Sequence, residues 1–332
     1  MPDRNLTRRR MITIVAMAAG SAFLTGGRTA QAGNAAQWRG SALGAQVSIE
    51  IYHTDRAEAE RLVERSVQDV RRLEQQFSLY RADSAICSLN RSGTLVSPDA
   101  DMVALLKASL FFGDLTDGAF DPTVQPLWQL YTEHFSSERP DPEGPSPERL
   151  AEALAKVGHS GLLVSADRIA LIKHGAAITL NGIAQGYATD RVVDGLRKAG
   201  LSTTLVDMGE IRVIGARPEG TPWRIGLADP DKAGALTETI DLVDRAVSTS
   251  AGAGFRFDSK GRFTHLFDPT TGRSPSLYST VSVIAPTATE ADALSTAFSL
   301  MPVPRIRSVV SIRPNVQARI TDSGGTLIVC DA

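Results

Sequence analysis

Residues 179–190, TLNGIAQGYATD, join two sequence patterns with almost no charge between them. The apolar run AAITL (176–180) predicts a short strand, and the residues after Gly186 have the apolar spacing of a helix that Gly200 ends. Gly182 and Gly186 lie at the junction. Two such glycines are typical of a simple turn, because glycine adopts backbone angles that other residues avoid. They also suit a loop whose amides, with a helix N-terminus behind them, bind a phosphate or a metal.

The bulk composition is that of a soluble globular protein. The chain has 332 residues, a net charge of −2 and 42% hydrophobic residues, which fits one large or two modest domains. Its pI is about 6.2, and no basic stripe is present to neutralise phosphates along a nucleic acid. We therefore expect no nucleic-acid partner.

Residues 1–32 predict a cleavable export signal. A basic start precedes an apolar stretch from Met11 to Leu24, which is too short and too rich in glycine and alanine to span a membrane. TRRRMI (7–12) resembles a twin-arginine signal, although an ordinary basic n-region is the simpler alternative. With cleavage after Ala32, we expect residues 33–332 to form a single periplasmic domain with no membrane span in the mature chain.

The two cysteines, Cys87 and Cys330, leave two alternatives open. They could pair in an oxidising compartment, but a domain of this size does not need a disulfide. Two buried free thiols fit the sequence equally well.

The order of the expected elements indicates an α+β fold. We expect a strand over 43–51, helices over 56–77, 99–113 and from Pro147, and short strands over 162–172. After residue 200, turn residues separate a series of short β-like runs, which predicts a largely antiparallel sheet without an interdomain linker. These runs include TTLVDM, IRVIG, WRIGLAD, LTETIDL, RAVSTS, FRFD (255–258), RFTHLF (262–267) and STVSVIA, before a helix at ATEADALSTAFSLM and a closing hairpin.

The segment PTATEADALSTAFSLM (286–301) carries a candidate metal site. Asp292 and Thr296 are four residues apart, so their oxygens leave one face of the predicted helix, and both are hard donors suited to Mg²⁺ or Ca²⁺. The alternative is a capping box formed by Thr289 and Asp292 at the helix start.

Three other segments contain polar or aromatic groups of possible use in catalysis or binding. His265 precedes the turn DPTTG and is a candidate base, although a lone histidine in a hairpin is usually structural. The stretch 117–131 holds Phe120, Trp128 and Tyr131, which form either a binding wall or part of the core. The stretch 77–90 is a polar helix-end loop.

Taken in order, these segments resemble the ApbE family, the FAD:protein FMN transferases, over nearly all of the expected mature chain. The blocks that carry the resemblance are LGA (43–45), FSLYRADSAICSLN (77–90), GAFDPTVQPLW (118–128), LNGIAQGYATDRV (180–192), LVDMGEIRVIG (205–215), PWRIGLADP (222–230), AVSTSAGAGFRF (246–257), THLFDPTTG (264–272) and ADALSTAFSL (291–300).

The resemblance implies a fold, a reaction and a set of residues. The implied fold has two T-fold-like duplicated α+β units with FAD between them. The implied reaction is Mg²⁺-dependent transfer of FMN from FAD to a Thr or Ser hydroxyl of another protein, with release of AMP. The implied metal ligands are Asp292, Thr296 and the Ala184 carbonyl, and the implied base is His265. The implied flavin-contacting residues are Leu43, Tyr80, Asp117, Asp121, Thr123, Gly182 and Gln185.

Two positions depart from the family pattern. Gln185 stands where many relatives have Lys, and Gly209-Glu210-Ile211 stands where many have Gly-Gly-Asn. The export signal also resembles that of a NosX-like periplasmic subgroup, which implies a membrane-bound respiratory or NosR-like electron-transfer protein as acceptor. A FAD pyrophosphatase that yields FMN and AMP, and a non-catalytic flavin-binding protein, remain the alternative functions.

Overall fold

The computed structural model describes residues 35–43, 45–52, 55–228, 235–275 and 277–331. The predicted signal at residues 1–32 lies outside this part of the chain. The helices are α1 (Arg56–Phe77), α2 (Ala85–Ser92), α3 (Ala100–Leu115), α4 (Gln125–Phe135), α5 (Pro147–Leu154), α6 (Ala184–Lys198), α7 (Ala288–Phe298) and α8 (Val303–Ser311), with short 3₁₀ turns η1 (Pro122–Val124), η2 (His159–Gly161) and η3 (Gly252–Gly254).

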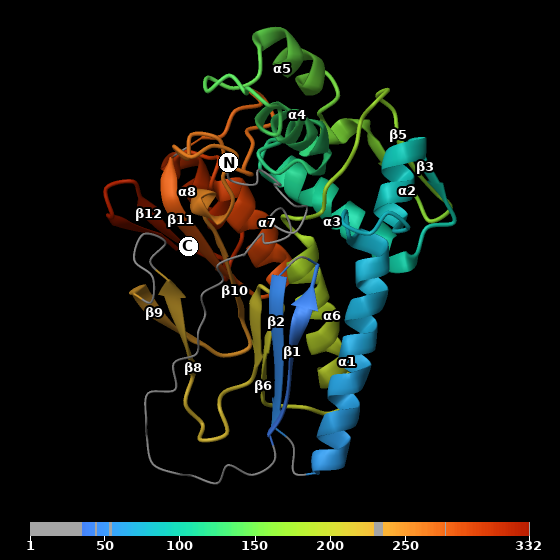
Figure 1. The fold of residues 1–332 in the computed structure, drawn as a ribbon. Helices are drawn as coiled ribbons and strands as arrows, with labels where there is room; N and C mark the ends of the chain where they lie inside the picture. The colour runs from blue at the N-terminus through green and yellow to red at the C-terminus, as the bar shows by residue number, and fades with distance from the viewer. Residues whose placement is uncertain (1–34, 44, 53–54, 229–234, 276, 332) are drawn as a thin grey trace, which may run out of the picture.

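An eight-stranded antiparallel sheet forms the centre of the molecule (Figure 1), in the order β1-β2-β6-β7-β10-β11-β12-β13. Its strands are β1 (Ala35–Ala42), β2 (Ala45–Tyr52), β6 (Thr204–Asp207), β7 (Ile211–Ile214), β10 (Ala246–Ser250), β11 (Tyr278–Ala285), β12 (Gln317–Asp322) and β13 (Leu327–Cys330). The α+β class with a largely antiparallel sheet is therefore confirmed.

The sheet consists of two halves with the same order of elements. In the first half, β1 and β2 precede α1, and α6 precedes β6 and β7; in the second, β10 and β11 are followed by α7, α8, β12 and β13. Both halves thus read strand-strand-helix-helix-strand-strand. This repeat agrees with the duplicated units that the family resemblance implied.

The first half contains a long insertion between α1 and α6. It holds α2 to α5 and a three-stranded sheet of β3 (Thr94–Val96), β5 (Arg168–Leu171) and β4 (Leu162–Val164). In Figure 1 these elements gather at the top of the molecule. The buried side chains of α2, α3, β4 and β5 join those of α7 and β11 in one apolar cluster, so this part of the insertion packs against the second half.

Alternating side chains give the sheet two covered faces. On β7, Arg212 points to α6, whereas Ile211 and Val213 pack against a separate hairpin of β8 (Trp223–Ala228) and β9 (Leu236–Leu242). This alternation is the period-two pattern of a strand buried on both faces. As a result, α6 and α7 lie against each other on one face, and the hairpin covers the other.

Three strand predictions were wrong. The apolar run 176–180 is not in a sheet, because the backbone N–H and C=O of Ile178 pair with the side-chain amide of Asn90, at 2.8 and 2.9 Å. FRFD and RFTHLF form only one isolated bridge, between Arg256 and Thr264. Their aromatic side chains pack in a local cluster instead of extending the main sheet.

Both cysteines are free thiols, Cys330 buried and Cys87 partly so. Among the residues described, no helix is both long enough and apolar enough to cross a bilayer.

Candidate active site

The N-termini of α6 and α7 bind each other through two carboxylates. Asp292 of α7 accepts a hydrogen bond from the Gly186 amide in the first turn of α6, with an N–O distance of 2.9 Å. In return, Asp190 of α6 accepts from the Ala288 and Thr289 amides of α7, at 2.8 and 2.9 Å. Each carboxylate accepts from amides at the start of the other helix, which have no partner within that helix. Each carboxylate therefore lies near the positive end of the other helix's dipole.

This arrangement corrects the capping box considered for Thr289 and Asp292. The residue that caps α7 is Thr287, whose hydroxyl oxygen accepts from the Glu290 amide. The Thr289 hydroxyl instead donates to Asp190. Asp292 is therefore not used to cap its own helix, and its carboxylate faces α6.

The two glycines of the opening stretch allow α6 to approach α7. A Cβ added to Gly186 would lie 2.3 Å from the Ala288 carbonyl oxygen and 2.8 Å from the Asp292 Cβ. A Cβ added to Gly182 would lie 2.9 Å from the Thr296 hydroxyl oxygen. All three distances are shorter than a Cβ contact allows without movement of the neighbouring atoms. The glycines therefore bring the loop before α6 directly against the face of α7 that carries the predicted metal ligands.

A cavity opens in front of this contact. It is lined by seven of the predicted site residues, namely Leu43, Asp121, Gly182, Gln185, His265, Asp292 and Thr296. These residues lie far apart in the sequence, and the fold brings them to one place. The chemical roles assigned to these residues stay predictions.

The cavity wall is acidic and contains one histidine. Asp121, Glu210 and Asp292 contribute three carboxyl groups, and no Lys or Arg is found among its lining residues in the described ranges. Asp292 is only 4% exposed, and burial, together with the charge of Asp190, raises its pKa to about 7 although the Gly186 amide acts in the opposite direction. A bound cation would favour the ionised form of this carboxylate.

His265 has the properties of a base. Burial lowers its pKa below the usual 6.5, so the ring is neutral at pH 7. Its Nδ1 lies 3.4 Å from the Phe255 carbonyl oxygen, which can only accept a hydrogen bond. Nδ1 therefore carries the hydrogen, and Nε2 keeps a lone pair that can take a proton.

Four predicted residues do not line the cavity. Tyr80 is 42% exposed and interacts with Asn181, which does line it. Asp117 forms an ion pair with Arg305, which engages its carboxylate away from the cavity. Ala184 is the first residue of α6 and directly precedes Gln185 in the chain. Its side chain is buried.

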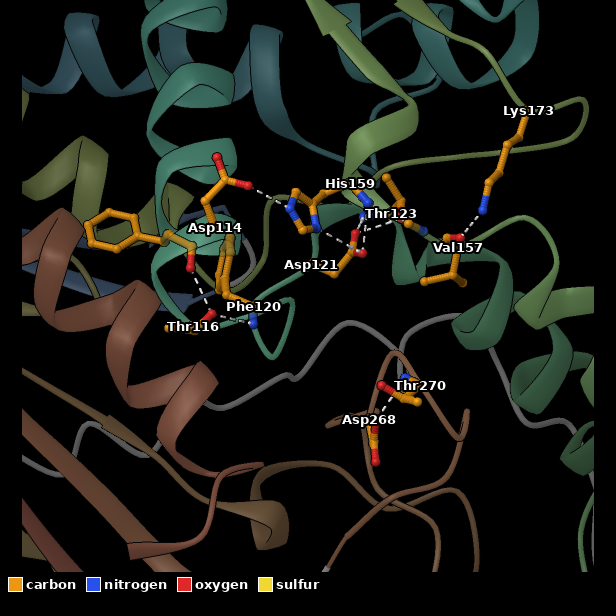
Figure 2. Close-up of polar contacts among 12 residues, drawn as sticks. Asp114, Thr116, Phe120, Asp121, Thr123, Val157, His159, Lys173, Asp268 and Thr270 are labelled. Atoms are coloured by element: carbon orange, nitrogen blue, oxygen red, sulfur yellow. Dashed lines mark hydrogen bonds and ion pairs between the residues drawn. The ribbon is translucent and has the colours of Figure 1, made fainter. Parts of the chain in front are cut away.

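Thr123, the fourth, is hydrogen-bonded to Asp121, which does line the cavity (Figure 2). The Asp121 carboxylate accepts from the Thr123 amide and hydroxyl at 2.7 and 2.6 Å, and from the His159 amide at 2.9 Å. The Thr123 hydroxyl oxygen accepts from the Gly158 amide at 2.7 Å. Both side chains are therefore occupied in joining η1 to the segment before β4, and direct flavin contact by Thr123 is not supported by this geometry.

Sequence reasoning did not identify His159 as part of this network. Its ring lies between two carboxylates, with Nε2 3.0 Å from Asp114 and Nδ1 3.6 Å from Asp121 (Figure 2). These partners, Asp121 first, raise the pKa of His159 above 6.5. A histidine directly after Gly158 gives no sequence signal for this role, because both carboxylates lie about forty residues earlier.

Aromatic side chains form another part of the cavity wall. Phe120, Trp128 and Phe267 line it. The Trp128 ring also lies 5.0 Å from the rings of Phe255 and Phe257 in a local aromatic cluster. The two interpretations of this segment therefore both apply, because the cluster is a small core with one surface facing the cavity.

Comparisons with known proteins agree with this fold. The crystal structure of the ApbE protein from Thermotoga maritima matches with a TM-score of 0.79 and 32% identity, covering 89% of this chain and 96% of that one. The structure called flavin transferase ApbE from Vibrio cholerae matches with a TM-score of 0.76 and 26% identity, covering 89% and 96%.

Sequence comparison leads to the same group. A protein of Escherichia coli named FAD:protein FMN transferase is 34% identical over 249 residues, which cover 71% of this chain and 70% of that protein. The profile of the ApbE family matches residues 43–320. The chain therefore belongs to the ApbE family.

Proposed function

We propose that this protein transfers FMN from FAD to a Thr or Ser hydroxyl of another protein and releases AMP. The observation that carries the proposal is the cavity that holds Asp292, Thr296 and His265 together, in a chain of the ApbE family. The names of the relatives support the same reaction, since they are FAD:protein FMN transferases.

The donor set fits Mg²⁺. Asp292 supplies a carboxylate and Thr296 a hydroxyl, and we assign the Ala184 carbonyl as a third protein ligand. Mg²⁺ in proteins is commonly held by one or two carboxylates together with phosphate oxygens of the substrate. The described ranges contain no group of three or more His, Cys, Asp or Glu side chains placed to hold a metal ion together, so the substrate and water would supply the remaining ligands. When bound, the ion neutralises charge on the pyrophosphate.

Charge balance favours a metal-dependent reaction. The cavity presents three carboxyl groups and no basic side chain but His265 among its described lining residues. A pyrophosphate placed there without a cation would find carboxyl groups and no balancing positive charge, and each ionised carboxylate 4 Å away would repel it by on the order of 4 kcal/mol. The binding of FAD should therefore require the cation.

His265 would activate the acceptor. Its Nε2 accepts the proton of the Thr hydroxyl while the Thr oxygen bonds to the phosphorus of the FMN half. The bond between that phosphorus and the bridging oxygen breaks, and AMP leaves with the bridging oxygen. Leu43, Gly182 and Gln185, with Tyr80 at the edge, would then contact the FAD.

We assign the reaction to the bacterial periplasm. Residues 1–32 would direct export as a twin-arginine signal, and residues 33–332 would form the single mature domain. The acceptor would be a membrane-bound respiratory protein, such as a NosR-like electron-transfer protein, that carries its flavin on Thr.

A thermal-shift titration tests the metal site. Mg²⁺ with FAD should raise the unfolding temperature of the wild type, and Asp292→Ala should remove both this shift and AMP release. Asp167→Ala, which removes an exposed carboxylate, is the control and should behave as wild type. An unchanged Mg²⁺ response in Asp292→Ala would refute the assignment.

A further inference from the structure

His159 packs against one wall segment of the cavity without lining the cavity itself. The wall segment is 119–122, all four residues of which line the cavity. The His159 amide donates to the Asp121 carboxylate in this segment at 2.9 Å. Its ring lies under the end of α3, where a Cβ added to Gly113 would be 3.0 Å from the ring carbon Cδ2. The backbone and the ring of His159 are therefore both held in place beside the wall segment (Figure 2).

Both ring nitrogens of His159 face a carboxylate. Nε2 lies 3.0 Å from an oxygen of Asp114, and Nδ1 lies 3.6 Å from an oxygen of Asp121. A neutral imidazole has one N–H and would turn a lone pair toward one of the two anions, whereas an imidazolium donates on both sides. The arrangement therefore fits the protonated ring. The pKa of His159 agrees: the hydrogen bond with Asp121 is the largest cause of its rise above 6.5, burial opposes the rise, and Asp114 adds to it.

Two further charged side chains belong to elements that pack near the ring, and each has a partner of its own. Lys173 follows β5, and its ammonium group donates to the carbonyl of Val157. Asp117 lies in the loop after α3 and pairs with Arg305 of α8. Neither bond involves the ring of His159. The charge of the ring therefore depends on the two carboxylates that face it.

The charge of Asp121 would act on a bound ligand through space. Its side chain is only 3% exposed, so a ligand in the cavity would feel the charge without a bond to the carboxylate oxygens. Salt screens a buried charge much less than an exposed one. The cavity lining has no described Lys or Arg to balance this carboxylate, whereas the protonated ring of His159 lies next to it. Loss of the ring proton would leave an unbalanced negative charge in the wall.

We propose that protonated His159 is a positioning residue for the substrate: it holds and balances the Asp121 carboxylate, and so strengthens the binding of a phosphate-bearing ligand in the cavity. The proposal rests on FAD as the substrate, as set out above. The pyrophosphate of FAD does not change its charge near neutral pH, so a change in affinity there reports on the protein. The affinity for FAD should fall as the pH rises through the folded pKa of His159. Binding and protonation are coupled, so bound FAD should in turn raise this pKa.

FAD binding on both sides of the folded pKa of His159 tests the proposal. Fluorescence titration at saturating Mg²⁺ gives the affinity, since a bound cation keeps Asp292 ionised. The ratio of the affinity of wild type to that of His159→Gln cancels the titration of all groups that the two proteins share. We expect a ratio of about five below the pKa, the low end of typical coupling between sites, and of about one above it. A ratio that is independent of pH overturns the proposal.

Asp114→Asn separates the charge of His159 from its packing. The Asp114 side chain is 80% exposed, so its loss should leave the fold intact. Without this carboxylate the pKa of His159 falls, and the loss of FAD affinity should move to lower pH. The matched control is Asp167→Asn, at an exposed carboxylate that is not paired with His159, and its profile should coincide with that of wild type. Coincident profiles for Asp114→Asn and wild type would overturn the proposal.

NMR titration of the His159 ring measures the coupling directly, with the signal assigned by its loss in His159→Gln. FAD with Mg²⁺ should raise the pKa of His159 by the logarithm of the affinity ratio, because coupling between two sites is reciprocal. An unchanged or lowered pKa with FAD bound would contradict the role assigned to His159. FAD that binds without transfer of FMN would refute the proposed function, whereas the pKa of the ring with and without FAD would still decide the role of His159.

Discussion

The Gly186 amide donates to the Asp292 carboxylate across 2.9 Å, although the two residues are 106 positions apart in the sequence. One belongs to the first half of the duplicated fold and the other to the second. The bond therefore joins the two halves at the residue assigned to the metal. It also explains why the stretch TLNGIAQGYATD contains a second glycine, since α6 can contact α7 this closely only without a side chain at residue 186.

Gly186→Ala should destabilise the protein. Its new Cβ would lie 2.3 Å from the Ala288 carbonyl oxygen, so α6 and α7 must move apart. Overpacking of this kind costs about 1–3 kcal/mol, and transfer activity should fall with it. Urea denaturation gives the free energy of unfolding. The matched control is Gly195→Ala in the same helix, where no atom lies within 4 Å and the change should stabilise by up to about 1 kcal/mol. Equal stability of the two variants would contradict the packing argument.

Asp190→Ala should destabilise the protein more than Gly186→Ala does. Asp190 accepts from the N-terminus of α7 and from Arg212 at 2.6 Å, and the Arg212 side chain is 7% exposed. Removing the carboxylate leaves the buried guanidinium without its close partner, with only the more distant Asp194 nearby, which costs up to about 3–5 kcal/mol. Asp194→Ala is the control, because its carboxylate is 3.8 Å from Arg212 and 44% exposed; it should cost less than about 1 kcal/mol. Similar losses in both variants, measured by urea denaturation, would contradict this assignment.

His159 should make stability depend on pH. Asp121 and Asp114 raise its folded pKa above the usual value of 6.5, so protonated His159 stabilises the fold. This contribution is fully present below the unfolded pKa near 6.5 and is lost as pH rises through the folded pKa. Denaturation between pH 5.5 and 8.5 should therefore show less loss with rising pH in His159→Gln than in wild type. His174→Gln, at an exposed histidine, should follow wild type. Identical pH profiles for His159→Gln and wild type would be inconsistent with the pairing of His159 with Asp114 and Asp121.

Much of the fold and part of the site could be predicted from the sequence. Asp292 and Thr296 share a helix, and a spacing of four places them on one face regardless of tertiary structure. Helix 56–77 has the same local basis, and α1 has these bounds. The antiparallel sheet followed from the short runs between turn residues.

The remaining features depend on partners that are distant in sequence. The run 176–180 has the composition of a strand, but the Asn90 side chain takes the hydrogen bonds that a neighbouring strand would have made. Thr123 belongs to a family block, yet its hydroxyl is used by Asp121 and Gly158. Glu210 was noted only as a departure from the family pattern, since its burial cannot be read from one sequence.

Gln185→Lys should reduce the dependence of FAD binding on Mg²⁺. Gln185 lines the cavity beside carboxyl groups that no described Lys or Arg in the lining balances. A cation at this position would attract the pyrophosphate and partly replace the metal. FAD affinity in EDTA, followed by flavin fluorescence, should rise and should weaken again at high salt. Gln129→Lys makes the same charge change at an exposed position outside the cavity and should have no effect. If both variants bind FAD in EDTA as weakly as wild type, the charge argument is wrong.

The most direct test of the central claim is mass spectrometry of an acceptor peptide. The protein is incubated with FAD, Mg²⁺ and a peptide that carries a candidate Thr, with Thr→Ala peptide and Asp292→Ala protein as controls. We predict FMN attached to the Thr by a phosphoester, together with one AMP per modified peptide, and neither product in the controls. Free FMN and AMP with an unmodified peptide, or bound FAD with no AMP released, would contradict the assignment as a flavin transferase.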